Sequence, residues 1–332
     1  LVDGRCPIHS NRELEIIEEE NYFFRFSKYQ KPLLEFYDKT PNFVVPESKF
    51  NEIKTFVKMG LQDFSISRLK SKMPWGIDIP GDLDQVIFVW FDALVNYISA
   101  IGWPDHLEKF NEWWPVVQFA GKDNLRQQSA IWQAMLMSAG LPNSKQIFIH
   151  GFITVNGQKI SKSLGNVINP LELVKKYGTD PVRYFLLAKI HPFEDSDFTI
   201  EKLEETYNAD LANGLGNLVA RVAKLAEKNN FSLEPRTYNL EPEIISYLDD
   251  FRIDLAIGFL WEKIKELDQK IDAAQPWKLE EKDLTSFLDK TIPDILKLSY
   301  NLQPFLPETA AKIQKQFTGK IKSAAPLFPR IS

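Results

Sequence analysis

The pattern of apolar residues changes once along this chain, near Thr199, and this change limits the possible folds more than any other feature. Before it, residues 82–151 alternate between short apolar segments of strand type and amphipathic segments of helix type. After it, apolar residues recur at helical spacing over residues 200–228, 241–274 and 284–313, with few strand signals. The chain is therefore predicted to join an α/β region to an all-α bundle.

The α/β region has a regular order of predicted elements. Strands are expected at residues 85–90, 116–120 and 146–149, and helices at residues 92–101 and 124–139. Apolar strands that alternate with helices predict a parallel sheet covered by helices. This region corresponds to one half of a doubly wound, Rossmann-type fold rather than to a whole one.

The bundle is expected to follow a compact helical linker at residues 170–187. Asn229-Asn230, Gln275-Pro276 and Pro304 interrupt the helical pattern and should separate its helices. The chain contains no internal repeats and no low-complexity segments.

Length and composition set the broad class of protein. A chain of 332 residues suggests two or three domains, and 44% hydrophobic residues supply a large core. The net charge of −5 argues against a general nucleic-acid coat. The single cysteine excludes an internal disulfide and fits a reducing cytosol, so a cytoplasmic protein is expected.

One apolar run, residues 86–103, is nearly long enough to cross a membrane as a helix. Asp92 and Asn96 interrupt it, and its first part has the β-branched and aromatic residues of a strand. A buried strand that leads into a helix is the better interpretation. No signal peptide is evident, and no membrane association is expected.

A loop with two lysines and two serines carries the strongest chemical signal, Lys159-Ile160-Ser161-Lys162-Ser163. It follows an expected buried strand, and Asn156-Gly157 just before it is a strong hairpin signal. Ligands of open α/β sheets bind beyond the strand ends. Lysine is a point-charge partner for phosphate, so the loop is predicted to close over a polyphosphate rather than to be a basic surface turn.

Other candidate residues stand near the ends of the expected strands. Trp90 and Asp92 close the first strand, and Gly121-Lys122-Asp123 follows the second, so these side chains should converge in one crevice. Core packing is the alternative role for Trp90 and for Trp132, and helix N-capping is the alternative for Asp123.

Three residues of the bundle have the chemistry of base recognition. Asn217 and Arg221 are one helical turn apart and share a face, and Trp277 follows Gln275-Pro276. An amide, a guanidinium and an indole are groups that read and stack unpaired bases. The alternative is a solvated helix face with a packed tryptophan.

Metal binding is not expected. Cys6 and His9 have a spacing that zinc could use, but a structural zinc site takes four ligands and no second pair follows.

Taken in order, these and other segments resemble the methionyl-tRNA synthetases, a family of class I aminoacyl-tRNA synthetases, over nearly the whole chain. The matching segments are residues 20–24, 61–68, 75–82, 89–97, 121–123, 159–166, 177–184, 208–213, 216–218, 275–277 and 327–330. Each segment is weakly specific by itself, and their common order makes the resemblance specific.

The resemblance implies a methionine–tRNA ligase that uses ATP with Mg²⁺, forms methionyl-adenylate and transfers methionine to tRNA(Met). The lysine loop looks like the Lys-Met-Ser-Lys-Ser signature of the family, with Ile160 in place of methionine. By this match Lys162 holds the ATP phosphates most directly and Lys159 supports it, and both are the expected catalytic residues. Ser161 and Ser163 complete the expected ATP site.

The remaining site residues also come from the resemblance. Those expected to bind methionine are Trp90, Ala93, Tyr97, Asp123, Gln128 and Trp132, and those expected to recognise the anticodon are Asn217, Arg221 and Trp277. The implied domains are a remnant of the connective, zinc-knuckle insertion (1–30), the second half of the Rossmann-like domain (31–155), the lysine loop with its helical linker (156–200) and the anticodon-binding domain (201–332).

The chain departs from the family pattern at three places. The His-Ile-Gly-His signature and the first half of the Rossmann fold are missing, so the chain alone is not expected to activate methionine. Asn124 and Gln128 stand where many members carry isoleucine and histidine. The knuckle is reduced to Cys6 and His9.

Two other functions fit parts of the pattern. A tRNA-binding module that had lost its chemistry would need the bundle but not the lysine loop. Another class I synthetase, of the cysteinyl or leucyl type, would share the loop but not residues 89–97 and 275–277, which favour methionine. The sequence does not indicate the oligomeric state.

Overall fold

The computed structural model describes residues 18–160 and 165–331. These form two compact units that divide after Ile149. Each unit has its own buried core.

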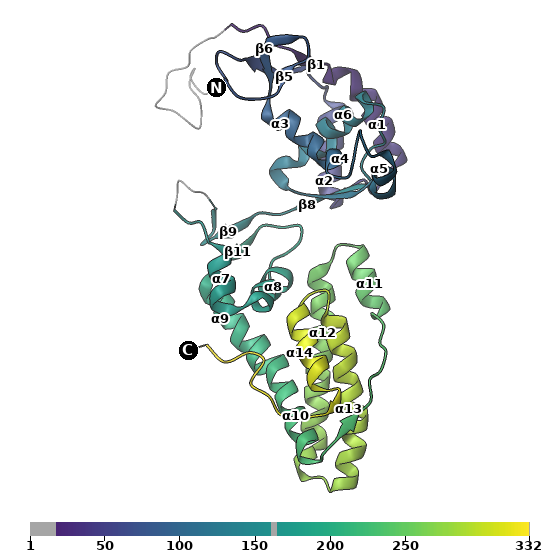
Figure 1. Ribbon diagram of the computed structural model, residues 1–332, viewed down its shortest axis with the longest axis vertical. Helices are drawn as coiled ribbons and strands as arrows, with labels where there is room; N and C mark the ends of the chain where they lie inside the picture. Colours follow the sequence, from purple (N-terminus) through teal and green to yellow (C-terminus); the bar gives the residue numbers. More distant parts are fainter. Residues whose placement is uncertain (1–17, 161–164, 332) are drawn as a thin grey trace. The chain divides into compact units, whose positions relative to one another are not determined.

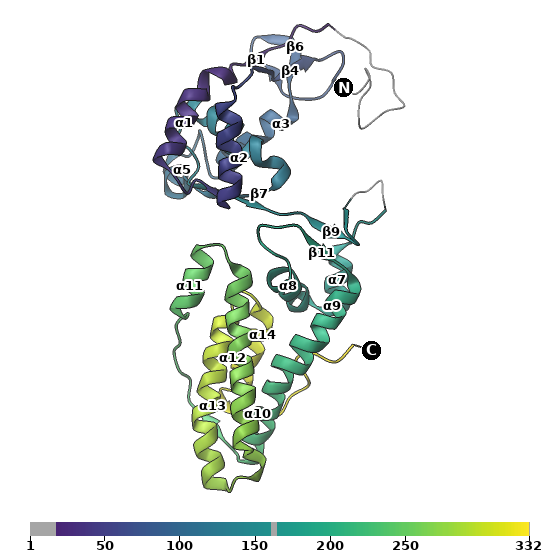
Figure 2. The same cartoon turned by 180° about the vertical axis from the view of Figure 1, so that it is seen from behind.

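The first unit contains a three-stranded sheet with the strand order β2 (Val44–Val45), β8 (Gln146–His150) and β7 (Val117–Gly121). Val44 pairs in parallel with Ile147 of β8. The amphipathic helices α1 (Gln30–Lys39) and α2 (Glu47–Lys58) lie side by side (Figures 1 and 2). Their apolar faces join the sheet in one core, which includes Leu33, Tyr37, Ile53, Val57, Ile147 and Ile149.

The prediction for residues 85–90 is wrong in two respects. The observed strand begins and ends three residues earlier, and it belongs to a different sheet. The strand β6 (Asp82–Ile87) pairs antiparallel with β4 (Ser67–Leu69) and with β5 (Asp78–Ile79) in a separate small sheet. The Pro80-Gly81 turn, with a positive φ at Gly81, folds β6 back onto β5 and so sets this pairing. A further short pair joins β1 (Phe23–Phe24) to β3 (Phe64–Ser65).

Residues 89–99 form a helical run, earlier than the sequence predicts. It consists of α3 (Val89–Asp92), a 3-10 turn (Ala93–Val95) and α4 (Asn96–Ser99). Trp90 and Asp92 therefore lie on a helix and not at a strand end, because the backbone turns helical after the extended residue Phe88.

The second predicted helix of this unit is confirmed. It comprises the 3-10 turn Lys122–Asn124, the π-helical segment Gln127–Ile131 and α6 (Trp132–Ser138). This helical segment and residues 89–99 bury Leu94, Ile98, Trp132 and Leu136 together with residues of α5 (Leu107–Trp113).

The second unit begins with the predicted hairpin, which is confirmed. Strands β9 (Ile153–Val155) and β10 (Gln158–Lys159) pair antiparallel around Asn156-Gly157. Both turn residues have positive φ, at 52° and 71°, as a tight type I′ turn requires. A third strand, β11 (Ser196–Phe198), adds in parallel to β9, and α7 (Pro170–Tyr177) and α8 (Thr179–Ala188) form the predicted helical linker.

The all-α bundle is confirmed, and the breaks after Lys228, Ala274 and Leu302 fall close to the predicted ones, whereas a further break at residues 250–252 divides a segment that was predicted as continuous. Its elements are α9 (Ile200–Thr206), a long π-helical segment (Tyr207–Gly216), α10 (Asn217–Lys228), α11 (Pro242–Asp249), α12 (Ile253–Ala274), a 3-10 turn (Pro276–Lys278), α13 (Glu281–Leu302) and α14 (Pro307–Gln316). A short sheet of β12 (Ser232–Leu233) and β13 (Gly319–Lys320) closes one end. One core unites α10, α12, α13 and α14 (Figure 1).

The linker helix α8 is fixed to the bundle by polar contacts. The buried carboxylate of Asp180 accepts a hydrogen bond from the Thr309 amide at 2.6 Å. The Arg183 guanidinium donates to the Phe305 carbonyl at 2.7 Å. Across the part of the chain that the structure describes, no helix is long and apolar enough to cross a membrane.

Candidate functional site

Three of the predicted methionine-binding residues meet in the first unit. Tyr97 lies on α4, and Gln128 and Trp132 lie one helical turn apart on the following helical segment. The Gln128 amide donates a hydrogen bond to Tyr97 Oη at 2.9 Å, and the rings of Tyr97 and Trp132 lie 6.0 Å apart. Gln128 and Trp132 are buried, whereas Tyr97 is 36% exposed. The group therefore has one accessible side, at the Tyr97 ring.

Two buried polar atoms of this cluster have no hydrogen-bond partner within the described residues, Gln128 Oε1 and Trp132 Nε1. Buried polar groups in proteins are nearly always satisfied, since an unpaired one costs about 1–3 kcal/mol. An acceptor and a donor left open in one apolar cluster indicate a place where a bound molecule or water completes the bonding.

The other predicted residues of this site lie on the same two helical segments. Trp90 and Ala93 precede Tyr97 by seven and four residues on the first helical run, and both are exposed. The Gln127 amide donates to the Trp90 carbonyl at 3.3 Å, which joins the two segments. Asp123 is exposed in the 3-10 turn at the start of the second segment.

The lysine loop is described only in part. Lys159 is exposed at the end of β10, and its Nζ lies 4.5 Å from the centroid of the Phe152 ring, a cation–π distance. Its carbonyl accepts a hydrogen bond from the Asn166 amide at 3.2 Å. Ser161, Lys162 and Ser163 lie outside the described residues.

Two carboxylates of the β11 region hold the lysine hairpin, and sequence reasoning missed both. Asp197 Oδ1 accepts hydrogen bonds from the Gly157 amide at 2.7 Å and from the Thr154 hydroxyl at 2.9 Å. Asp195 Oδ1 accepts from the Phe152 amide at 2.8 Å. The hairpin that carries Lys159 is thus fastened at its base and at its turn. We call this pair of carboxylates the hairpin clamp.

The clamp carboxylate at the turn is ionised at neutral pH. The hydrogen bond from the Gly157 amide, followed by that from Thr154, lowers the pKa of Asp197 below its ordinary value of 3.8. Its contribution to stability is therefore present above pH 3.8 and is lost only as the pH falls through the lower pKa of the folded state.

A glycine allows the clamp to form. A Cβ atom on Gly151 would lie 2.2 Å from the backbone carbonyl of Glu194, closer than any real contact. Gly151 thus lets the start of the hairpin approach the segment that carries Asp195 and Asp197. This Gly precedes β9 and could have been noted in the sequence, although its distant neighbour could not.

In the bundle two of the predicted anticodon residues, Asn217 and Trp277, are exposed, and the half-buried Arg221 lies against the Trp277 ring. The Arg221 guanidinium stands 5.8 Å from the centroid of the Trp277 ring, which is 50% exposed. Asn217 is exposed one turn before Arg221 on α10.

Two acidic residues of α12 hold Arg221 in place, and sequence reasoning missed them as well. Arg221 Nη1 lies 3.0 Å from Asp268 Oδ1, and Nη2 pairs with Asp272. Burial raises the pKa of Asp268, which the Arg221 charge partly opposes. Asp268 and Asp272 are one turn apart and share a face of α12, but this spacing alone does not show that Arg221 of α10 lies against them.

No group of three or more metal-ligating side chains occurs in residues 18–160 and 165–331. The sequence candidates Cys6 and His9 lie outside these residues.

Comparison with known proteins identifies the family. The family model described as tRNA synthetases class I (M) matches residues 1–223. A structure of the Mycobacterium tuberculosis methionyl-tRNA synthetase in complex with methionyl-adenylate is similar with a TM-score of 0.87 and 31% identity, over 99% of this chain and 72% of that one. The chain belongs to the methionyl-tRNA synthetase family. Its combination of a parallel sheet and a helical bundle is the fold of this family, as the sequence predicts.

Curated relatives in this family include the methionine–tRNA ligases of Thermotoga maritima and of Nostoc sp., each 39% identical to the chain. The matches cover 93% and 95% of the chain, respectively. The chain spans 52% and 64% of the length of these two relatives.

Proposed function

We propose that this chain acts in the ligation of methionine to tRNA(Met), with the lysine hairpin, part of the methionine pocket and the anticodon-binding surface among its residues. Membership of the methionyl-tRNA synthetase family supports the proposal. The observation that carries it is the cluster of Tyr97, Gln128 and Trp132, which has two unsatisfied polar atoms and one accessible side.

The proposed reaction has two steps. The methionine carboxylate attacks the α-phosphate of ATP, and methionyl-adenylate forms as pyrophosphate leaves. The terminal ribose hydroxyl of the tRNA then attacks the carbonyl carbon of the adenylate, and AMP leaves. ATP enters as its Mg²⁺ complex, in which the ion shares the phosphate charge.

The lysine hairpin is proposed to act in the first step. Lys162 and Lys159 stabilise the charge that develops on the leaving pyrophosphate, and Ser161 and Ser163 donate hydrogen bonds to phosphate oxygens. The hairpin clamp supports this role, since charge stabilisation of this kind depends on fixed positions. Lys159 is exposed, so it is accessible to a nucleotide.

The cluster of Tyr97, Gln128 and Trp132 in the first unit is proposed to take the methionine side chain. The Gln128 amide donates to Tyr97 Oη, so the hydrogen of the Tyr97 hydroxyl points elsewhere and is available to a weak acceptor such as a thioether sulfur. The Trp132 ring supplies an apolar wall. Trp90, Ala93 and Asp123 are proposed to complete this site, the Asp123 carboxylate as a partner for the α-ammonium group.

The bundle surface is proposed to bind the anticodon. Trp277 offers an exposed ring on which an unpaired base stacks, and Asn217 and Arg221 offer hydrogen-bond donors beside it. The single cysteine fits a reducing compartment, and we place the protein in the cytoplasm.

The test is methionine-dependent exchange of pyrophosphate into ATP by the protein that contains this chain. Exchange with methionine is expected, and exchange with leucine or cysteine alone would contradict the proposal in favour of another class I synthetase. Binding of tRNA(Met) without any amino-acid-dependent exchange would indicate a non-catalytic tRNA-binding module instead.

A further inference from the structure

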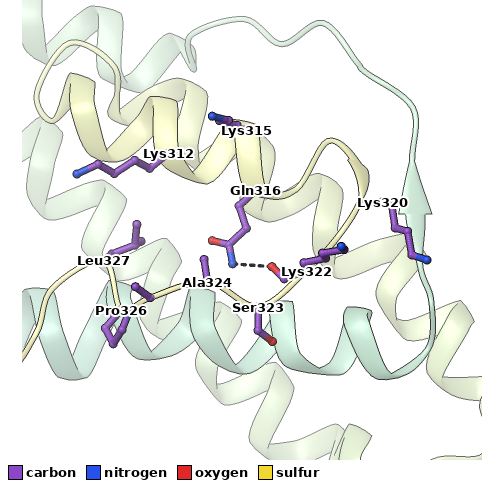
Figure 3. Close-up of a pocket in the computed structure, with 10 residues that line it drawn as sticks. Lys312, Lys315, Gln316, Lys320, Lys322, Ser323, Ala324, Pro326 and Leu327 are labelled. Atoms are coloured by element: carbon purple, nitrogen blue, oxygen red, sulfur yellow. Dashed lines mark hydrogen bonds between the residues drawn. The ribbon is translucent and has the colours of Figure 1, made fainter.

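A groove lined by lysines opens on the bundle between α14, β13 and the segment that follows β13. Its volume is about 540 Å³. Figure 3 shows Lys312 and Lys315 on α14, Lys320 on the strand, and Lys322 on the segment beyond it. Ala324, Pro326 and Leu327 supply apolar surface to the same groove.

The protein offsets little of the positive charge of this groove, although the Lys322 charge acts on the nearby Glu227 carboxylate. Its four lysines are exposed, and none forms an ion pair with a described residue. Residues 307–332 carry five basic side chains and one acidic one, Glu308, although the whole chain has a net charge of −5. The groove is thus a local positive surface on an acidic protein.

The backbone around the groove is fixed, so the lysines extend from a firm base. The Gln316 amide donates to the Lys322 carbonyl at 3.1 Å (Figure 3). The Ser323 amide donates to the Glu227 carboxylate at 3.2 Å, and hydrogen bonds from Ser323 lower the pKa of Glu227. The Glu227 carboxylate is therefore already engaged by the segment that follows β13.

The groove and the proposed anticodon surface both involve the helix α10. Asn217, Arg221, Lys224 and Lys228 recur along one face of α10, and Glu227 lies roughly a quarter turn around the same helix. Because Ser323 binds Glu227, the groove meets α10 about a third of a turn around the helix from Arg221. Lys224 and Lys228 are exposed and continue the positive surface between the two.

We propose that this groove holds the sugar–phosphate backbone of the tRNA whose anticodon meets Trp277 and Arg221. The proposal rests on the proposed function. The lysines spread along the groove and extend in different directions (Figure 3), which suits an extended chain of phosphates better than one small anion. Lysine contacts phosphate as a flexible point charge and reads no base, so the contact is independent of sequence.

The test is the salt dependence of tRNA(Met) binding to the 332-residue chain. A variant in which Lys312, Lys315, Lys320 and Lys322 are all changed to Gln is compared with the unchanged chain at about 50–200 mM KCl, a range over which affinity that depends on phosphate contacts falls steeply. Each phosphate that the protein no longer neutralises lowers the slope of log K against log salt by about 0.7–0.9. A decrease of about two to three slope units and of more than about tenfold in affinity at low salt is expected.

A matched variant controls for the change in net charge. Lys263, Lys270, Lys290 and Lys297 of α12 and α13 are changed to Gln instead, and two of these lysines already pair with carboxylates. This variant should bind tRNA within about twofold of the unchanged chain and keep its slope. Thermal unfolding of the bundle should be the same for all three proteins.

The outcomes separate this proposal from the proposed function. If the unchanged chain binds tRNA and both variants keep its slope, the groove does not hold the backbone. If the groove variant binds tRNA normally but loses binding to an acidic polypeptide such as polyglutamate, the partner is a protein and the proposal is wrong. If the unchanged chain does not bind tRNA, both the anticodon assignment and the groove proposal fail.

Discussion

The two units hold their candidate residues in place by different means. In the first unit, Trp132 is 1% exposed, and packing fixes both it and Gln128. In the second unit, Trp277 is 50% exposed, and carboxylates fix its neighbour Arg221 and the lysine hairpin from the surface. A largely buried cluster of side chains suits a small, mostly apolar ligand, whereas exposed groups with fixed partners suit a nucleotide or an RNA.

This difference implies that substitutions in the two units separate stability from function. Packing contributes several kcal/mol per large buried side chain, but surface ion pairs contribute about 0–1 kcal/mol. Changes in the pocket should therefore alter folding as well as binding. Changes at the clamp or at the RNA surface should alter activity with little effect on folding.

The largest effect is expected from Trp132→Ala. Removal of this buried indole leaves a cavity between the two helical segments and should lower the free energy of unfolding of the first unit by about 3–5 kcal/mol. The free energy of unfolding is measured by urea unfolding. The control is Trp113→Ala on α5, where the ring is 59% exposed and the expected change is within about 0.5 kcal/mol. Equal losses of unfolding free energy in the two variants would contradict the distinction between buried and exposed tryptophans.

The next effect is expected at the hairpin clamp. Asp197→Ala removes the acceptor for the Gly157 amide and the Thr154 hydroxyl, so the hairpin with Lys159 should lose its fixed position. Methionyl-adenylate formation should fall on the order of ten- to a hundredfold, while tRNA affinity stays unchanged. Single-turnover pyrophosphate release measures the first quantity.

Two variants refine this prediction. Asp197→Asn keeps an oxygen acceptor and should retain more activity than Asp197→Ala. Glu201→Ala removes an exposed carboxylate of α9 nearby and should leave the rate unchanged. Full activity of Asp197→Ala would show that the clamp is not needed to position the hairpin.

Trp277→Ala should lower the affinity for tRNA and change no other property. Loss of one stacked base costs about 1–3 kcal/mol of tRNA affinity, or about five- to 150-fold. Adenylate formation and thermal stability should not change, because the ring is half exposed. Trp277→Phe restores a stacking ring and should recover most of the affinity. A matching loss of adenylate formation would point to a structural role in the bundle.

The sequence predicted element types well but not all of their partners. The strand–helix alternation of residues 116–149 and the three long helical segments of the bundle follow from apolar periodicity, which reports burial directly. Periodicity does not report which strand lies alongside. Residues 85–90 were therefore predicted as a strand of the parallel sheet, whereas the observed strand β6 covers residues 82–87 and pairs antiparallel with β5 across the Pro80-Gly81 turn.

The residues of the candidate site also divide into those that local sequence patterns predict and those that they do not. Recognisable motifs identified Tyr97, Gln128 and Trp132 from the sequence, and the contacts among the three side chains support their grouping. Asp197 was missed because its role depends on a bond to Gly157, 40 residues away, that no local pattern records. Asp268 was missed for the same reason, since its partner Arg221 lies on a different helix.

The smallest effect is expected from Gln128→His, which makes the methionine pocket titratable. Glutamine does not ionise, so the KM for methionine in the unchanged protein should be flat between about pH 5.5 and 8 with respect to this group. An imidazole titrates near pH 6.5, and its charged form is costly in a buried site beside the Tyr97 hydroxyl. The KM should therefore rise a few-fold as the pH falls below about 6.5 and recover above it.

Gln128→Leu loses the hydrogen bond at every pH and should raise the KM by about two- to tenfold without a pH dependence. A rise of the same size at low pH in the unchanged protein would place the titrating group elsewhere, and would mean that the Gln128 amide does not control the pocket.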